Sequence, residues 1–156
     1  MQSFQLVGLS PNPFESYFSL TDSELANMGA RRVIAQKNPG YPCRISLVDA
    51  EPGEELLLLP YRHQPANSPY ESSGPIYVRR GATQHLANVG EIPEYVMRRL
   101  ISVRGYDAAD MMIEADVCEG PKVAVEIERQ LHNAEVRYIH LHNAKRGCFS
   151  CLVQRV

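Results

Sequence analysis

Two histidines and a tyrosine alternate with aliphatic residues in the segment Tyr138-Ile139-His140-Leu141-His142. Side chains of a β-strand point alternately to its two faces. A strand here therefore places Tyr138, His140 and His142 on one face and turns the aliphatic pair toward the core. Neighbouring imidazoles can act as acid and base, bind an anion, or share a metal ion. The pattern predicts a polar site on this strand.

A third histidine, His63, follows a stretch predicted as a strand over residues 54–61. The next two residues break the strand pattern, and a polar, proline-rich loop extends over residues 66–75. Binding and catalytic side chains often gather where a strand ends and a loop begins. We therefore expect His63, His140 and His142 to be the catalytic candidates of one pocket.

The same three histidines form a candidate zinc site, which is the less favoured alternative. Imidazole nitrogens are common zinc ligands, but no H-E-x-x-H helix or other motif of fixed ligand spacing occurs in the chain. No other cofactor is predicted, because glycine patterns of nucleotide-binding loops are absent as well. A metal-free pocket is the expectation.

Arg79 lies at the end of a predicted strand over residues 75–79. A guanidinium group near several imidazoles favours a carboxylate or a phosphate, because it donates two parallel hydrogen bonds to either anion. We expect Arg79 to line the same concave site as the histidines and to hold an anionic ligand there. Polar residues nearby are further ligand-binding candidates: Asn143, Tyr138, Ser68 and Tyr70.

The chain has four cysteines and no segment that resembles a signal peptide. Reduced thiols in a cytoplasm are therefore expected rather than a disulfide framework. Cys43 would alternate with Ile45 and Leu47 on a strand over residues 43–48. We expect it to face the core as an inert thiol, since burial in an apolar environment disfavours the reactive thiolate.

Along the chain, the spacing of the hydrophobic residues changes between the period of a helix and that of a strand. The best local signal is a capping box over residues 21–24, with Gly29 placed to end its helix in a left-handed turn. Four leucines at 56–59 are apolar on both faces, which indicates a central strand covered on both sides. Helices are expected over residues 14–18 and 21–29, from Pro93 onward, and over 122–132; strands are expected over 32–35, 43–48, 54–61, 75–79, 101–106, 111–117, 136–142 and 148–153.

This order of elements predicts an α+β fold. We expect a single domain over residues 1–156, with three or four helices packed on one mixed, mostly antiparallel sheet. A composition of 44% hydrophobic and 22% charged residues is ordinary for a globular chain of 156 residues.

Charge and hydropathy argue against two classes of partner. Lys and Arg number 16 against 18 Asp and Glu, evenly along the chain, so no basic surface for nucleic acid is expected. The longest aliphatic run has four residues, too few to cross a membrane. We expect a cytoplasmic protein that contacts neither nucleic acid nor membrane.

Five segments stand out together: PGYPCRISL at 39–47, DAEPGE at 49–54, HQPANSPY at 63–70, SGPIYVR at 73–79 and HLHNAKRGC at 140–148. In this order, and over nearly the whole chain, they resemble the bacterial domain-of-unknown-function family numbered 1203. The resemblance implies a small stand-alone bacterial protein. No activity follows from it, but the matched segments contain most of the polar residues singled out above.

The hypothesis that these residues favour is an enzyme acting on a small anionic metabolite. His63, His140 and His142 would serve as acid and base, Arg79 would hold the anion and Asn143 would orient it. Two alternatives stay open: a non-catalytic binding or sensor module that uses the same pocket, and a structural homodimer in which the histidines are incidental. Either a monomer or a homodimer is compatible with the sequence.

Overall fold

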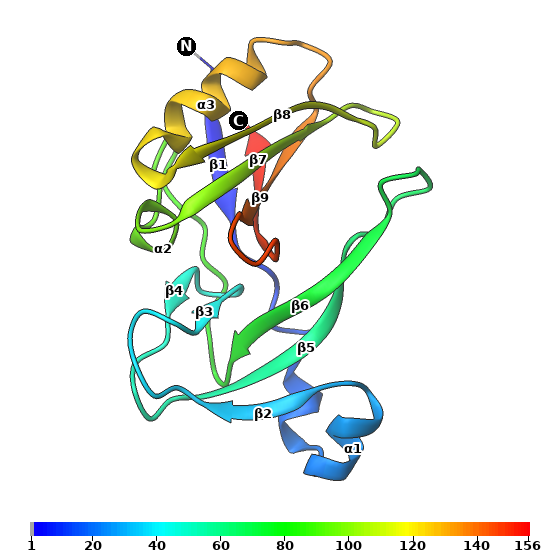
Figure 1. Cartoon of the computed structure of the whole chain (residues 1–156), viewed down its shortest axis with the longest axis vertical. Helices are drawn as coiled ribbons and strands as arrows, with labels where there is room; N and C mark the ends of the chain where they lie inside the picture. Colours follow the sequence, from blue (N-terminus) through cyan, green and yellow to red (C-terminus); the bar gives the residue numbers. More distant parts are fainter. Residues whose placement is uncertain (1) are drawn as a thin grey trace.

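Two five-stranded β-sheets dominate the structure, a computed structural model that describes residues 2–156 (Figure 1). The first sheet has the strand order β1-β10-β9-β7-β8 and the second the order β2-β5-β6-β3-β4. The strands are β1 (Phe4–Val7), β2 (Arg31–Ile34), β3 (Pro42–Cys43), β4 (Val48–Asp49), β5 (Glu55–Gln64), β6 (Ser72–Arg79), β7 (Leu100–Tyr106), β8 (Met112–Glu119), β9 (Tyr138–Asn143) and β10 (Phe149–Arg155).

The helical elements are short. They are the α-helices α1 (Asp22–Asn27), α2 (Glu94–Met97) and α3 (Val123–Leu131), and the 3₁₀ turns η1 (Glu15–Ser19) and η2 (Gly120–Lys122). None of the helices within residues 2–156 has the length and apolar character needed to cross a membrane.

The first sheet is antiparallel throughout and packs α3 against one face (Figure 1). Val123 and Ile127 lie one helical turn apart and are buried against Val103 of β7 and the pair Ile139 and Leu141 of β9. The aliphatic residues of β9 thus face the core. Because strand side chains alternate, the polar residues of β7 and β9 are left on the opposite face.

In the second sheet β5 is an interior strand, paired with β2 on one side and with β6 on the other. Leu57 and Leu59 pack on one face with Phe14 and Phe18, which come from the segment around η1. Leu56 is buried in a smaller cluster on the other face. The expected central strand with apolar cover on both sides is confirmed.

The N-cap of the predicted capping box forms. The Thr21 hydroxyl oxygen accepts a hydrogen bond of 3.1 Å from the backbone N–H of Glu24. Gly29 follows the helix with a φ of 73°, a left-handed conformation that glycine adopts without strain.

The prediction of a single sheet is wrong, because the strands form two sheets. The predicted α+β class and the mostly antiparallel pairing agree with the structure. The two sheets bury different apolar surfaces, one against α3 and the other against the segment around η1. Hydrophobic alternation reveals which face of a strand is buried but not which strands pair, so it could not separate the sheets. Strand β1 is not among the predicted strands.

The predicted strand over residues 43–48 is also wrong. Its two ends form β3 and β4, and the chain reverses between them through Leu47, whose φ is 53°. The Leu47 N–H donates to the Cys43 carbonyl at 3.0 Å, which closes this turn. Cys43 and Ile45 are nevertheless fully buried, as expected. The predicted helix over residues 14–18 is the 3₁₀ turn η1.

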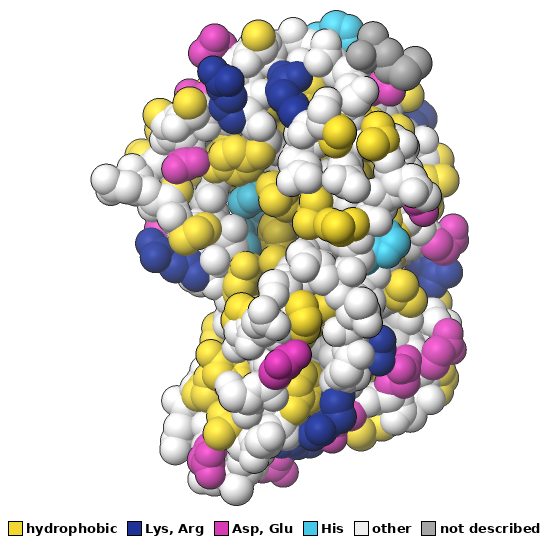
Figure 2. Space-filling view, turned by 180° about the vertical axis from the view of Figure 1, so that it is seen from behind, with side chains coloured by type: hydrophobic (Ala, Val, Ile, Leu, Met, Phe, Trp, Pro, Cys, Tyr) yellow, Lys and Arg dark blue, Asp and Glu magenta, His cyan; other side chains and the backbone are white. Residues whose placement is uncertain are grey.

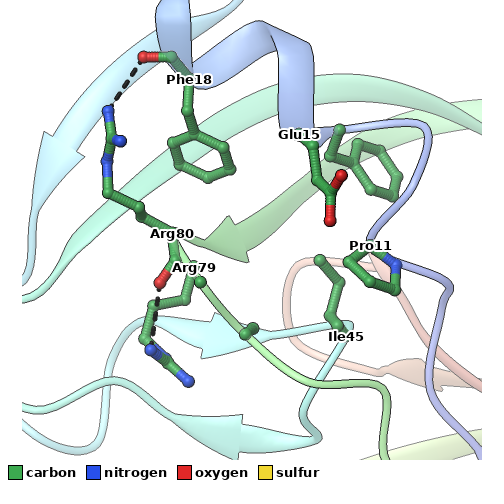
Figure 3. A pocket seen from close by; sticks show the side chains of 9 residues that line it. Pro11, Glu15, Phe18, Ile45, Arg79 and Arg80 are labelled. Carbon is green, nitrogen blue, oxygen red and sulfur yellow. Dashed lines mark hydrogen bonds between the residues drawn. The ribbon is translucent and has the colours of Figure 1, made fainter.

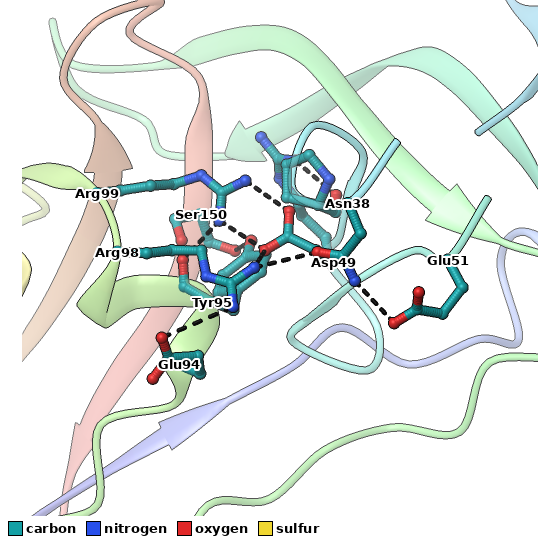
Figure 4. A network of polar contacts seen from close by, with 10 residues as sticks. Asn38, Asp49, Glu51, Glu94, Tyr95, Arg98, Arg99 and Ser150 are labelled. Atoms are coloured by element: carbon teal, nitrogen blue, oxygen red, sulfur yellow. Dashed lines mark hydrogen bonds and ion pairs between the residues drawn. The ribbon is translucent and has the colours of Figure 1, made fainter. Parts of the chain in front are cut away.

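Two arginine contacts join the sheets. The buried Arg44 side chain donates to the Phe149 carbonyl of β10 and to the Pro42 carbonyl of β3, both at 2.7 Å. Asp49 of β4 accepts two hydrogen bonds from Arg99, at 2.5 and 2.9 Å (Figure 4). Arg98 also lies 3.4 Å from the Asp49 carboxylate.

Candidate functional site

The polar face of the first sheet carries paired side chains from two strands. The register of β7 and β9 sets Ser102 opposite His142, Arg104 opposite His140 and Tyr106 opposite Tyr138. Cβ atoms of such cross-strand partners lie about 5 Å apart. These side chains therefore form one continuous surface between the sheets.

His63 reaches this surface from the second sheet. A bulge between Tyr61 and Gln64 interrupts β5 just before the strand ends. The His63 ring centroid lies 4.9 Å from that of His142 and 6.3 Å from that of His140. The three predicted catalytic candidates, separated by up to 79 positions in the chain, are thus brought together.

Phe149 packs against all three histidines. Its ring stacks on His63 with a centroid distance of 5.5 Å and meets His140 and His142 nearly edge-on at 5.2 and 5.8 Å. A bulge in β10 after Phe149 makes this possible, because it turns the ring toward the histidines while Cys151 faces the core below α3.

Each of the three histidines has a buried ring nitrogen without a hydrogen-bond partner in the described part of the chain. The His63 Nδ1, His140 Nδ1 and His142 Nε2 atoms are buried and have no hydrogen-bond partner among residues 2–156. One ring nitrogen from each histidine lies within 4.8 Å of the other two. The other nitrogen of His142, Nδ1, lies 2.9 Å from the Gly147 carbonyl. A carbonyl only accepts, so Nδ1 carries the proton and Nε2 presents a lone pair.

Burial keeps these imidazoles neutral at physiological pH. Burial, with smaller contributions from the charges of His142, His63 and Arg104, lowers the pKa of His140 to about 3. Burial likewise lowers the pKa of His142 to about 4, against the opposing effect of its bond to Gly147. The pKa of the half-buried His63 is also lowered, mainly by burial and then by the charge of Arg104.

Arg104 is the cation of this site. Its side chain is half-buried and donates from Nε to the Ser102 hydroxyl at 3.0 Å. No acidic side chain among residues 2–156 forms an ion pair with it, in contrast to Arg79, Arg80 and Arg99. Its charge acts on all three histidines.

A hydrogen-bonded rim connects the tips of two hairpins beside the histidines. Tyr138 donates to the Asp110 carboxylate at 2.6 Å and accepts from Gln64 at 2.9 Å. Ser68 donates to the Asp110 carbonyl at 2.9 Å, and the Tyr70 ring meets Tyr106 edge-on at 6.3 Å. Tyr138, Ser68 and Tyr70 thus belong to the rim of the site. In Figure 1 the β5–β6 hairpin rises toward the β7–β8 hairpin.

Arg79 does not belong to the histidine cluster, contrary to expectation. It pairs with Leu56 on β5, seven residues before His63, a separation of about 23 Å along a strand. Its guanidinium lies 3.4 Å from Glu54 and donates to the Arg80 carbonyl. It lines a different cavity, of about 260 Å³, between β6 and the segment around η1 (Figure 3).

Asn143 is not brought to the histidines either. It is the last residue of β9 and pairs with Ile101, so alternation gives it the core side of the strand. Its carbonyl accepts from the Gly147 N–H at 2.7 Å. Asn143 therefore helps to shape the turn whose Gly147 carbonyl orients His142, on the opposite face of β9 from the rings.

Five residues of the site are not among those predicted from the sequence: Arg104, Tyr106, Gln64, Asp110 and Phe149. A signal for two of them exists: Ser102, Arg104 and Tyr106 alternate with Val103 and Gly105 exactly as Tyr138, His140 and His142 alternate with aliphatic residues. Two strands with matching polar faces suggest a shared surface. Phe149 gave no such signal, because only the bulge turns it toward the histidines.

The histidine cluster suits a metal ion. Tetrahedral zinc with Zn–N bonds of 2.0–2.1 Å sets its ligand nitrogens about 3.4 Å apart, so small ring rotations would close the present arrangement around an ion. Neutral imidazoles have the protonation state that ligation requires. The His142–Gly147 hydrogen bond is the kind of contact that orients metal ligands. Figure 2 shows histidine side chains in a hollow among hydrophobic groups on one face of the molecule.

Comparison with known proteins places the chain in a family but attaches no activity to it. No curated protein and no solved structure matches the chain. The model of one protein family matches residues 40–155, a region that contains all three histidines and Arg104. The chain therefore belongs to the family described as Protein of unknown function (DUF1203).

Proposed function

We propose that this protein is a metal-dependent enzyme whose His63, His140 and His142 bind one divalent transition-metal ion, of which zinc is the best fit. The observation that carries the proposal is that each of the three histidines offers a ring nitrogen within 4.8 Å of the other two, and that each has a buried ring nitrogen without a hydrogen-bond partner among the described residues. A buried polar atom without a hydrogen bond costs free energy, and ligation of a metal ion by such nitrogens would remove that cost.

An open coordination position favours catalysis over a purely structural role. Structural zinc sites are closed by four protein ligands, whereas catalytic sites keep three and leave one position for water or substrate. A metal at such a position polarises a bound group or lowers the pKa of a bound water. The three histidines then act as ligands rather than as acid and base.

The small anionic metabolite expected from the sequence remains the proposed substrate, with one change of residue. Arg104 adjoins the histidines and has no acidic partner, whereas Arg79 lies elsewhere and is paired with Glu54. The proposed enzyme therefore uses Arg104 as its cationic group.

Metal content tests this function directly. The protein purified without chelators, or dialysed against zinc or cobalt(II), is expected to hold about one ion per chain by elemental analysis. His140→Ala and His142→Ala should reduce this content severalfold. His132→Ala is the matched control, because this exposed histidine at the end of α3 lies outside the cluster. Metal content that is negligible in the wild type, or unchanged in His140→Ala, contradicts the proposal.

A further inference from the structure

Arg104 occupies an unusual position for a cation. It lies beside three imidazoles, directly opposite His140 on the neighbouring strand, and its hydrogen-bond partners are the hydroxyl groups of Ser102 and Tyr106. No carboxylate or carbonyl oxygen of residues 2–156 accepts from its terminal amino groups. Arginines that are partly or fully buried are usually held by an acidic group or by carbonyls, as the partly buried Arg99 and the buried Arg44 are here.

The charges around the cluster do not balance once a metal ion is present. Three neutral histidines contribute nothing, while the ion and Arg104 bring about three positive charges. The nearby acidic groups are engaged elsewhere: Glu71 pairs with Arg62 at 2.9 Å, and Asp110 accepts from Tyr138. Buried charge of one sign is costly without a partner. The occupied centre therefore needs an anionic ligand.

The groups around Arg104 favour a carboxylate over a phosphate as the anionic ligand. Phosphate sites usually combine several donors, such as helix N-termini and clusters of backbone N–H groups. Here the neighbours of the single guanidinium are aromatic: Tyr106 and Tyr138 stack with centroids 5.2 Å apart, and Phe149 lies under the histidines. One arginine fork and one metal position suit the two oxygens of a carboxylate, and the rings suit an apolar body.

We propose that the ligand of this site is a small organic carboxylate whose charged group lies between the metal ion and the Arg104 guanidinium, with its body against the aromatic rings. This inference rests on the metal centre proposed above. It makes Arg104 the residue that determines specificity for the carboxylate, while the histidines hold the metal.

Cobalt(II)-loaded protein provides the test, because cobalt absorbance reports both metal uptake and a change of its ligands. Benzoate and acetate are expected to shift the visible spectrum saturably, benzoate at lower concentration. Arg104→Gln should weaken benzoate binding at least about tenfold while cobalt uptake stays at about one ion per chain. Arg104→Lys keeps the positive charge but lacks the planar guanidinium, so its affinity for benzoate should lie between those of the wild type and Arg104→Gln.

Two control variants test whether benzoate binding depends on Arg104 in particular or on the loss of any arginine. Arg62→Gln removes an exposed cation from the same hairpin as His63, and Arg79→Gln removes the cation of the distant cavity. Both should bind benzoate like the wild type.

The outcomes separate the two proposals. Absence of cobalt uptake by the wild type would overturn the metal centre and this inference with it. Normal uptake with benzoate affinity unchanged in both Arg104 variants would overturn the carboxylate inference alone. Inorganic phosphate that binds more tightly than benzoate in an Arg104-dependent manner would also overturn it. If Arg104→Gln takes up no cobalt, the Arg104→Lys protein decides the question.

Discussion

At the level of single residues, His140 and His142 link the site to the stability of the fold. Their exposed fractions are 5% and 1%, and burial lowers their pKa values to about 3 and about 4. In the unfolded chain a histidine titrates near pH 6.5. Between pH 6.5 and 4 the unfolded state therefore binds protons that the folded state does not, and its free energy falls relative to the folded state.

We predict that the chelator-treated protein loses stability on acidification over this pH range. The contribution of the two histidines is complete above pH 6.5 and declines by up to about 2.7 kcal/mol per pH unit below it. Urea unfolding at pH 7, 6 and 5 measures the slope. His140→Gln, which cannot titrate, should reduce the slope by about one proton, whereas His132→Gln should leave it unchanged. An equal slope in His140→Gln would show that His140 does not titrate in this way.

Some residues of the site can be predicted from the sequence and others cannot. Alternation along one strand placed His140 and His142 together, and the end of a hydrophobic strand marked His63. The choice between Arg79 and Arg104 could not be made in this way, because it depends on how β7, β9, β5 and β6 are aligned. Register is a property of pairs of strands, and a single sequence does not reveal the pairs.

At the level of elements, the connection from β1 to η1 is a tightly packed segment. The Gly8 N–H donates to the His85 carbonyl and the Leu9 N–H to the Arg44 carbonyl, both at 2.8 Å. A Cβ atom added at Gly8 would lie 2.1 Å from the carbonyl oxygen of Ile45. Since this neighbour is backbone, relief requires movement of the segment between β3 and β4.

Gly8→Ala is therefore expected to destabilise the protein by at least about 1–3 kcal/mol, as overpacked sites do. Gly74→Ala is the control, because an added Cβ there meets no atom within 4 Å. Denaturant unfolding of both variants measures the difference. Equal stability of the two would mean that the packing around Gly8 yields without cost.

The elements that sequence reasoning identified are those with strong local causes. The capping box of α1, the apolar stripe of α3 and the alternation of β7 and β9 depend on neighbours within a few positions. The turn at Leu47 and the bulges in β5 and β10 depend on contacts with distant segments. These long-range features are the ones that bring His63 and Phe149 into the site.

At the level of the whole molecule, Asp49 joins the second sheet to the start of the first. Its side chain is 2% exposed, and Arg99, the residue just before β7, is 18% exposed. Asp49→Asn keeps the shape but removes the charge, which leaves a largely buried guanidinium without its counterion. We expect a loss of about 2–4 kcal/mol of unfolding free energy, measured in urea.

The control for Asp49 is an ion pair on the surface. Glu71→Gln breaks the pair with Arg62, in which both side chains are substantially exposed, and should cost no more than about 1 kcal/mol. A cost for Asp49→Asn as small as this would show that Arg99 finds water or another acceptor when Asp49 is neutral.

The proposed metal ion would add a further connection between the sheets, since His63 comes from β5 while His140 and His142 come from β9. A ligand that binds only the folded state stabilises it by about 2.7 kcal/mol at a hundred times its Kd. For a chain of this size that corresponds to a rise in Tm of roughly 5–10 °C.

We predict such a rise with zinc for the wild type and for His132→Ala, and less than half of it for His63→Ala. Hydrogen exchange should locate the effect, with zinc slowing exchange at the tip of the β5–β6 hairpin in the wild type and in His132→Ala but not in His63→Ala. An equal rise in His63→Ala would place the metal on the first sheet alone and remove the link between the sheets.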